Sequence, residues 1–91
     1  MRTPADKIDT LVSAAHEAAF LRPLLGDAPQ AWFAQVERAL IDRMVAAKPT
    51  DDEARRDAAL ELHAIRKVRQ MIAATVAAGD YANKKLELTN D

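Results

Sequence analysis

The strongest constraint on this fold is the pattern that starts at Thr50. Thr50-Asp51-Asp52-Glu53 has the spacing of a capping box, in which Thr and a Glu three residues later satisfy the free N–H groups of a helix start. The acidic residues also suit the positive end of the helix dipole. Apolar residues then recur at helical spacing until Gly79, a usual stop signal. The pattern predicts one helix over 51–78, roughly 40 Å long. Its predicted inner stripe is Ala54, Ala58, Leu62, Ile65, Ile72 and Val76.

Two shorter helices are predicted before it. The first covers 4–21 and ends there because Pro23 disfavours helix in the residue before it. The second covers 28–47, with Asp27 and Gln30 at the spacing of another capping box. Its inner stripe is predicted to be Phe33, Val36, Leu40 and Met44.

Composition agrees with an all-α fold. Apolar residues make up 49% of the 91, but aromatic residues make up only 4%. Much of the apolar share is alanine, which favours helix strongly and adds little buried area. We expect a three-helix bundle, or a long antiparallel helical hairpin with an extra N-terminal helix. The helical domain is predicted to cover 1–79.

The last twelve residues are predicted to differ from the rest. Gly79 should end the long helix, and Leu86-Glu87-Leu88 alternates like a very short strand. We therefore expect 80–91 to be an extended or flexible tail. If a partner orders it, Leu86 and Leu88 should lie on one side of the segment and Glu87 on the other.

Several classes of function are disfavoured by what the chain lacks. It has no Cys, which removes thiol nucleophiles and thiolate zinc sites. Its two Gly are too few for a loop that cradles phosphate. A net charge of -1 is unlike the basic excess of a general nucleic-acid binder. No targeting segment or membrane span is visible, so we expect a cytoplasmic location, or a place in the virion for a phage protein.

Two histidines and one serine were weighed as catalytic or metal-binding groups. His16-Glu17-Ala18-Ala19-Phe20 resembles a zinc-binding H-E-x-x-H motif, but Phe20 stands where the second His is required. His63 and Ser13 have no surrounding motif that would supply an orienting partner. The prediction is therefore no enzyme, no cofactor, no metal and no small-molecule substrate.

Three arginines share one flank of the long helix. Arg55, Arg66 and Arg69 could contact phosphate or an acidic partner. Alternatively, they pair with acids of the second helix, such as Glu37 or Asp42. The second interpretation is favoured, since charged side chains on neighbouring helices commonly pair.

A second apolar stripe on the long helix is the main functional hint. Together with the inner stripe it spans more than half of the circumference, whereas a helix that faces its neighbours on one side needs an arc of ~100° or somewhat more. Either a second copy or a larger partner covers the surplus, or the first two helices cover it all. The candidate partner-interface residues are Leu60, Ala64, Met71, Ala78, Leu86 and Leu88.

Between Phe33 and Gly79 the sequence resembles small all-helical accessory proteins of tailed bacteriophages. The resemblance is carried by an apolar helix that ends in Lys48-Pro49-Thr50-Asp51-Asp52-Glu53, followed by Arg55-Arg56 and by Leu60-Glu61-Leu62-His63-Ala64-Ile65-Arg66. It implies an accessory role in virion assembly or genome packaging, and it assigns no catalytic residue.

The sequence thus predicts a non-enzymatic helical interaction or assembly module that forms homo-oligomers or binds a protein partner. The alternative is a small DNA-binding regulatory or packaging protein. Acidic residues at the start of the long helix disfavour that alternative, because a recognition helix contacts bases with its N-terminal residues.

Overall fold

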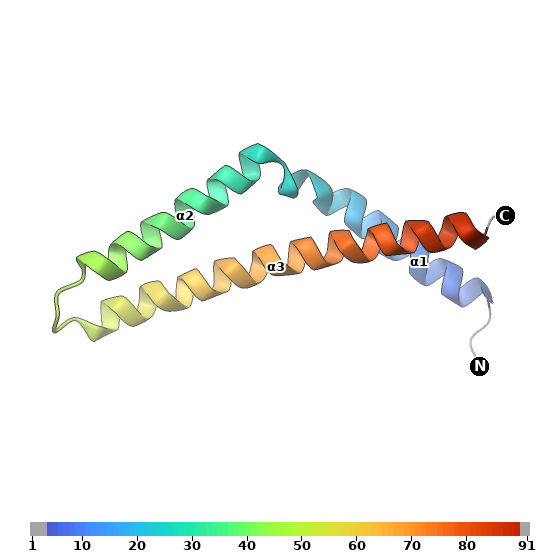
Figure 1. Ribbon diagram of the computed structural model, residues 1–91. Coiled ribbons are helices and arrows are strands. Elements are labelled where there is room, and N and C mark those ends of the chain that lie inside the picture. Colours follow the sequence, from blue (N-terminus) through green and yellow to red (C-terminus); the bar gives the residue numbers. More distant parts are fainter. Residues whose placement is uncertain (1–3, 90–91) are drawn as a thin grey trace. The chain divides into compact units, whose positions relative to one another are not determined.

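The computed structural model describes residues 4–89, and within that range every element is helical (Figure 1). The elements are α1 (Pro4–Leu21), a 3-10 turn η1 (Arg22–Leu25), α2 (Asp27–Ala46) and α3 (Asp52–Thr89). The predicted all-α class is confirmed. None of the described helices combines the length and the apolar character needed to cross a membrane.

The chain forms two compact units, and α3 contributes to both. One unit combines α2 with α3 up to Gln70, and the other combines α1 and η1 with α3 from Met71 onward. Each unit therefore has its own small set of buried side chains.

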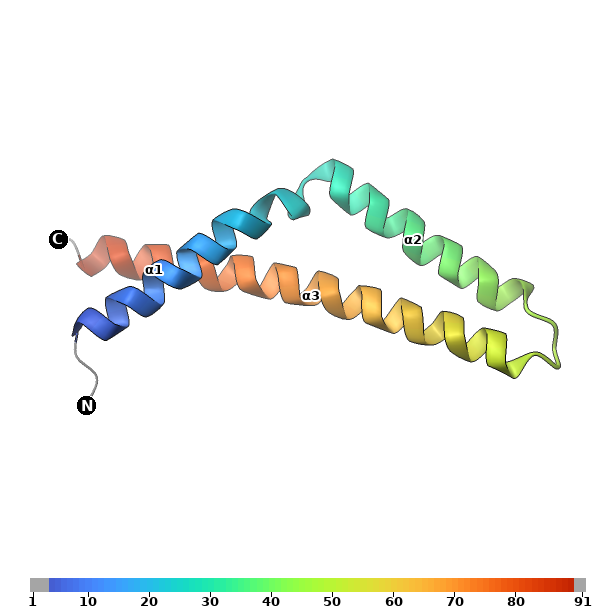
Figure 2. The same cartoon turned by 180° about the vertical axis from the view of Figure 1, so that it is seen from behind.

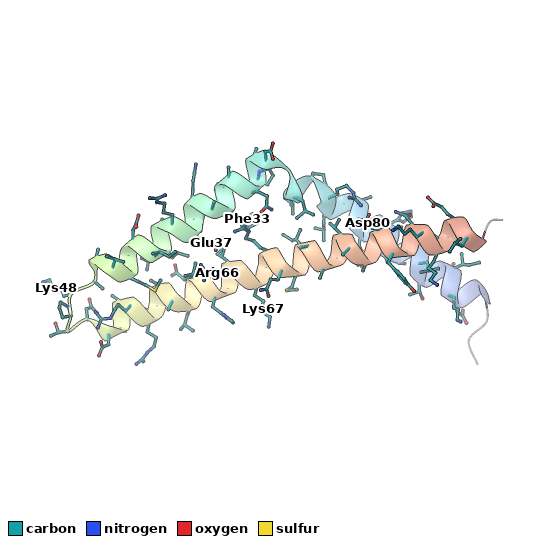
Figure 3. All side chains as sticks on the ribbon, in the orientation of Figure 1. Phe33, Glu37, Lys48, Arg66, Lys67 and Asp80 are labelled. Atoms are coloured by element: carbon teal, nitrogen blue, oxygen red, sulfur yellow. The ribbon has the colours of Figure 1, made fainter. Side chains whose placement is uncertain are left out.

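In the first unit, α2 and the early part of α3 form an antiparallel hairpin (Figures 1 and 2). Its buried side chains are Phe33 and Leu40 from α2, and Ala58 and Leu62 from α3. Figure 3 shows Phe33 directed from α2 toward α3. The predicted inner stripes of both helices are confirmed here, because their remaining members in this unit are half-buried.

The turn between α2 and α3 is closed by polar contacts to the backbone. Asp51 caps α3, since its Oδ1 accepts a hydrogen bond from the backbone N–H of Ala54 at 3.1 Å. The Arg55 guanidinium donates to the carbonyl oxygens of Lys48, at 2.6 Å, and Pro49, at 3.0 Å. The predicted capping residue, Thr50, is therefore wrong by one position, because α3 begins at Asp52 and the residue before it, Asp51, accepts from the N–H three residues later.

The start of α2 also differs from its prediction by one residue. The helix begins at Asp27, and Gly26 precedes it without a side-chain hydrogen bond to the first turn. The side chain of Gln30 is instead used elsewhere, because its Oε1 accepts a hydrogen bond from Arg69 on α3. This side chain thus makes a tertiary contact that the local pattern did not predict.

In the second unit, α1 packs against the later part of α3. Buried residues are Ala18 from α1 and Ile72, Val76 and Ala82 from α3. The two helices lie close together at Gly79. A Cβ atom built there would overlap the Ala18 side chain and lie 2.9 Å from the Ala14 carbonyl oxygen. Only a residue without a side chain fits, which explains the glycine inside a helix.

The predicted end of α3 at Ala78 is wrong. The helix continues through Gly79 to Thr89, and Gly79 does not adopt the left-handed conformation of a helix stop. The predicted extended tail is therefore wrong over 80–89, and residues 90 and 91 lie outside the described residues. The physical reason is burial: Ala82 is buried and Leu86 half-buried in this unit. Those contacts offset the entropy of ordering the segment.

The two leucines of this segment also lie on opposite faces. Positions two apart on a helix differ by roughly 200° in direction, whereas they share a side only in an extended strand. Leu86 accordingly lies half-buried, while Leu88 is 71% exposed. The prediction that both would face one partner is wrong.

Replacing Gly79 tests this packing. Gly79→Ala normally stabilises a helix interior by about 0.5–1 kcal/mol, but here the new methyl meets Ala18 and the backbone of Ala14. We expect destabilisation of about 1–3 kcal/mol, typical of overpacking, in urea unfolding followed by circular dichroism. The double variant with Ala18→Gly removes one of the two clashes and should recover part of the loss. A more stable Gly79→Ala variant would contradict the close approach.

Candidate interaction surfaces

The covered face of α3 follows a seven-residue repeat. Buried and half-buried positions recur at alternating four- and three-residue spacing, and this set is called the inner seam. Such spacing is typical of a helix that packs lengthwise against other helices. The inner seam consists of Ala58, Leu62, Ile65, Arg69, Ile72, Val76 and Gly79.

Arg69 is the one charged residue of the inner seam, and its polar groups are satisfied by α2. Its guanidinium carbon lies 5.5 Å from the centroid of the Phe33 ring, within the range of a cation–π contact. One terminal nitrogen donates to Gln30 Oε1 at 2.6 Å, and the other donates to Glu37. The aliphatic part of Arg69 therefore adds to the packing while its charge is compensated.

Glu37 is the acidic centre of this cluster. Its side chain is only 12% exposed, and its carboxylate accepts hydrogen bonds from Arg66 Nε, at 2.8 Å, and from Arg69. Figure 3 shows Glu37 and Arg66 between α2 and α3. The hydrogen bond from Arg66 is the largest influence that lowers the pKa of Glu37, and Arg69 lowers it further. Partial burial acts in the opposite direction.

All three arginines named as a basic flank have partners within the chain. Arg66 and Arg69 bind Glu37, while Arg55 binds the α2–α3 turn and pairs with Asp52. For Arg66 and Arg69 this is the pairing with the second helix that the sequence favours, whereas Arg55 pairs within its own helix and turn. Arg69 belongs to the inner seam by its register position, and not to a flank beside it.

The groove beside this cluster has mixed charge. It encloses about 580 Å³ and is lined by Arg38, Arg66 and Arg69 together with the carboxylates Glu37 and Asp42. Opposite charges in one groove weaken the field that would attract phosphate. The cluster therefore acts as a polar contact between α2 and α3.

The other face of α3 has a second seven-residue repeat, which is exposed throughout. We call it the outer stripe; Figure 3 shows one of its members, Lys67, directed away from α2. Its larger apolar side chains are open to solvent: Leu60 is 61% exposed, Met71 59% and Leu88 71%. The outer stripe consists of Leu60, Ala64, Lys67, Met71, Ala74, Ala78, Tyr81, Lys85 and Leu88.

Most of the predicted interface residues fall on the outer stripe. Leu60, Ala64, Met71, Ala78 and Leu88 belong to it, and all five are exposed. The alternative, that the first two helices cover the whole of α3, is therefore wrong.

One candidate lies off the outer stripe and four members of the stripe were missed. Leu86 is half-buried and belongs to the covered side of its unit. Sequence reasoning missed Lys67, Ala74, Tyr81 and Lys85. The signal that could have found them is the alternating spacing, which continues beyond Gly79 without interruption.

The second unit also exposes an aromatic side chain on α1. Phe20 is 83% exposed and borders a shallow groove of about 370 Å³, together with His16, Glu17, Leu21 and Thr75. His16 was considered as a zinc ligand. In the described part of the chain, no group of three or more acidic or histidine side chains is placed to hold a metal ion.

Comparison with known proteins adds no family to this description. No protein-family model, no curated protein and no solved structure matches the chain.

The pKa of Glu37 gives a pH-dependent prediction. Because folding lowers this pKa from the ordinary value of 4.5, the ionised carboxylate stabilises the fold fully above that value. The stabilisation is lost as the pH falls through the lowered value. We expect Glu37→Gln to reduce the free energy of unfolding by about 1–3 kcal/mol at pH 7, and the difference from the unmodified protein to shrink in acid.

Glu61→Gln is the matched control, because Glu61 pairs with Arg43 at 2.9 Å but both side chains are more than half exposed. Such pairs contribute about 0–1 kcal/mol. Urea unfolding from pH 7 to pH 3 compares the two variants. The assignment of Glu37 as the stabilising carboxylate would be contradicted if both variants lost the same free energy of unfolding at pH 7. It would also be contradicted if the loss in Glu37→Gln did not change with pH.

Proposed function

We propose that this chain is a non-enzymatic helical assembly module that associates through the outer stripe of α3, with copies of itself or with a larger helical partner. The single observation that supports the proposal is the exposed seven-residue repeat on the face opposite the inner seam. A helix needs only one apolar face to pack within its own chain, so the second face is available for another chain.

The energetics of the outer stripe favour association. Covering a large apolar side chain is worth roughly 1.5–3 kcal/mol, and Leu60, Met71 and Leu88 are all largely exposed. The buried set inside the chain is small, with alanines at several of its positions. Burial in an oligomer would therefore add substantially to the stability of each copy.

Alanines within the outer stripe also suit a helix–helix contact. Ala64, Ala74 and Ala78 alternate with larger residues, which lets a second helix approach closely at those levels. In this proposal the α2–α3 hairpin supports the contact surface, and α1 braces the later part of α3. No catalytic step, cofactor or metal is assigned to the chain.

The resemblance to small helical proteins of tailed phages suggests the biological setting. In this proposal the module acts in virion assembly or genome packaging, within the host-cell cytoplasm or the virion. The alternative role, a small DNA-binding protein, is less well supported, because Arg66 and Arg69 are paired with Glu37. Asp52 and Glu53 in the first turn of α3 would also repel phosphate.

A charge placed in the outer stripe tests the proposal. Leu60→Glu should weaken self-association at least about tenfold, because it buries a carboxylate in the contact, while leaving helix content unchanged. The control is Ala73→Glu, which adds the same charge at an exposed position of α3 outside the stripe. Light scattering gives the mass of each variant, and circular dichroism gives its helix content. Equal masses for both variants and the unmodified protein would contradict the proposal.

A further inference from the structure

We infer that the occupant of the outer stripe is a second copy of this chain, and that the two α3 helices pair antiparallel. The inference rests on the proposed function and adds the identity and orientation of the partner. It is argued from the order of charged residues along the stripe.

The repeat of the outer stripe extends back to the first turn of α3. Glu53 and Asp57 precede Leu60 at the same alternating spacing, and both are exposed. The stripe therefore has acidic residues near its beginning and a lysine, Lys85, near its end. Lys67 is the only charged residue between them.

This order of charges is unsuitable for a parallel pair. In a parallel pairing in register, each residue lies beside its own copy, so Glu53, Lys67 and Lys85 would each face a like charge. Like charges at facing positions destabilise helix pairs. Reversing one helix leaves no like charges directly opposite each other and brings the acidic end of one copy to the basic end of the other.

One antiparallel register pairs every level of the stripe from Glu53 to Lys85. It places Glu53 opposite Lys85 of the second copy and Asp57 opposite Tyr81, whose hydroxyl can donate to the carboxylate. Toward the centre, Leu60 lies opposite Ala78, Ala64 opposite Ala74, and Lys67 opposite Met71. Large residues thus face small ones, and the lysine stem can lie along methionine with its ammonium group in water.

This arrangement is closed and self-complementary. Every pair occurs twice, because a two-fold axis between Lys67 and Met71 relates the two copies. No part of the stripe between Glu53 and Lys85 is left over to bind a third chain in the same way. The inference therefore predicts a dimer as the unit of association.

Cysteine cross-linking tests the orientation, because the natural chain contains no cysteine. A mixture of Ala64→Cys and Ala74→Cys should form a mixed disulfide, since these residues lie opposite each other. Ala64→Cys alone should not cross-link to itself. In the proposed register its two copies are ten residues apart along the helices, roughly 15 Å, beyond the reach of a disulfide. In a parallel pair, Ala64→Cys would cross-link to its own copy, and the mixture would form no disulfide between residues 64 and 74.

Charge exchange provides a second readout that does not require a new disulfide. Lys85→Glu alone and Glu53→Lys alone should each weaken the dimer roughly two- to tenfold, and the double variant should recover most of that loss. Sedimentation equilibrium measures all three. No recovery in the double variant would contradict the pairing of Glu53 with Lys85.

The outcomes separate this inference from the proposed function. A dimer with the mixed disulfide supports both. A dimer in which Ala64→Cys cross-links to itself overturns the antiparallel pairing but leaves self-association intact. A chain that stays monomeric by light scattering at all concentrations overturns the inference and the self-association on which it rests.

Discussion

Packing along the inner seam of α3 is the interaction on which the rest of the structure depends. Among the described residues, the buried side chains of α1 and of α2 share their units only with buried residues of α3, and from Ala58 to Gly79 the covered residues of α3, apart from Thr75, follow one seven-residue repeat. Because that repeat uses one face of the helix, the opposite face is left with a repeat of its own. The exposed outer stripe is thus a direct consequence of how α3 is used inside the chain.

The two units use different chemistry along the same seam. In the α2–α3 hairpin, Arg69 occupies a seam position and reaches Phe33, Gln30 and Glu37. These contacts favour one register of α2, since sliding it would leave the nearly buried Glu37 without its arginines, at a cost of several kcal/mol. In the α1 unit the seam position is Gly79 instead, and its contact with Ala18 allows α1 and α3 to approach closely. Charged side chains thus specify the contact between α2 and α3, and a glycine specifies the contact between α1 and α3.

Much of the fold could be predicted because helix periodicity is a local property of sequence. The inner stripes follow from it directly, and the end of α1 follows from Pro23, which disfavours helix in the residue before it. The end of α3 could not be predicted in this way, because glycine is used both to end a helix and to let a neighbouring helix pack closely against it. Only its contact with Ala18 distinguishes the two. Leu86 and Leu88 were misplaced as a consequence, and Arg69 was misplaced because a charge at a seam position is rare without a partner such as Glu37.

The central claim is that the outer stripe drives self-association of the unmodified chain. Sedimentation equilibrium over micromolar to millimolar concentrations tests it most directly, since the mass of a single chain is 10.0 kDa. The account predicts a mass that rises with concentration toward twice that value and then stays constant. A mass of one chain at every concentration would contradict it.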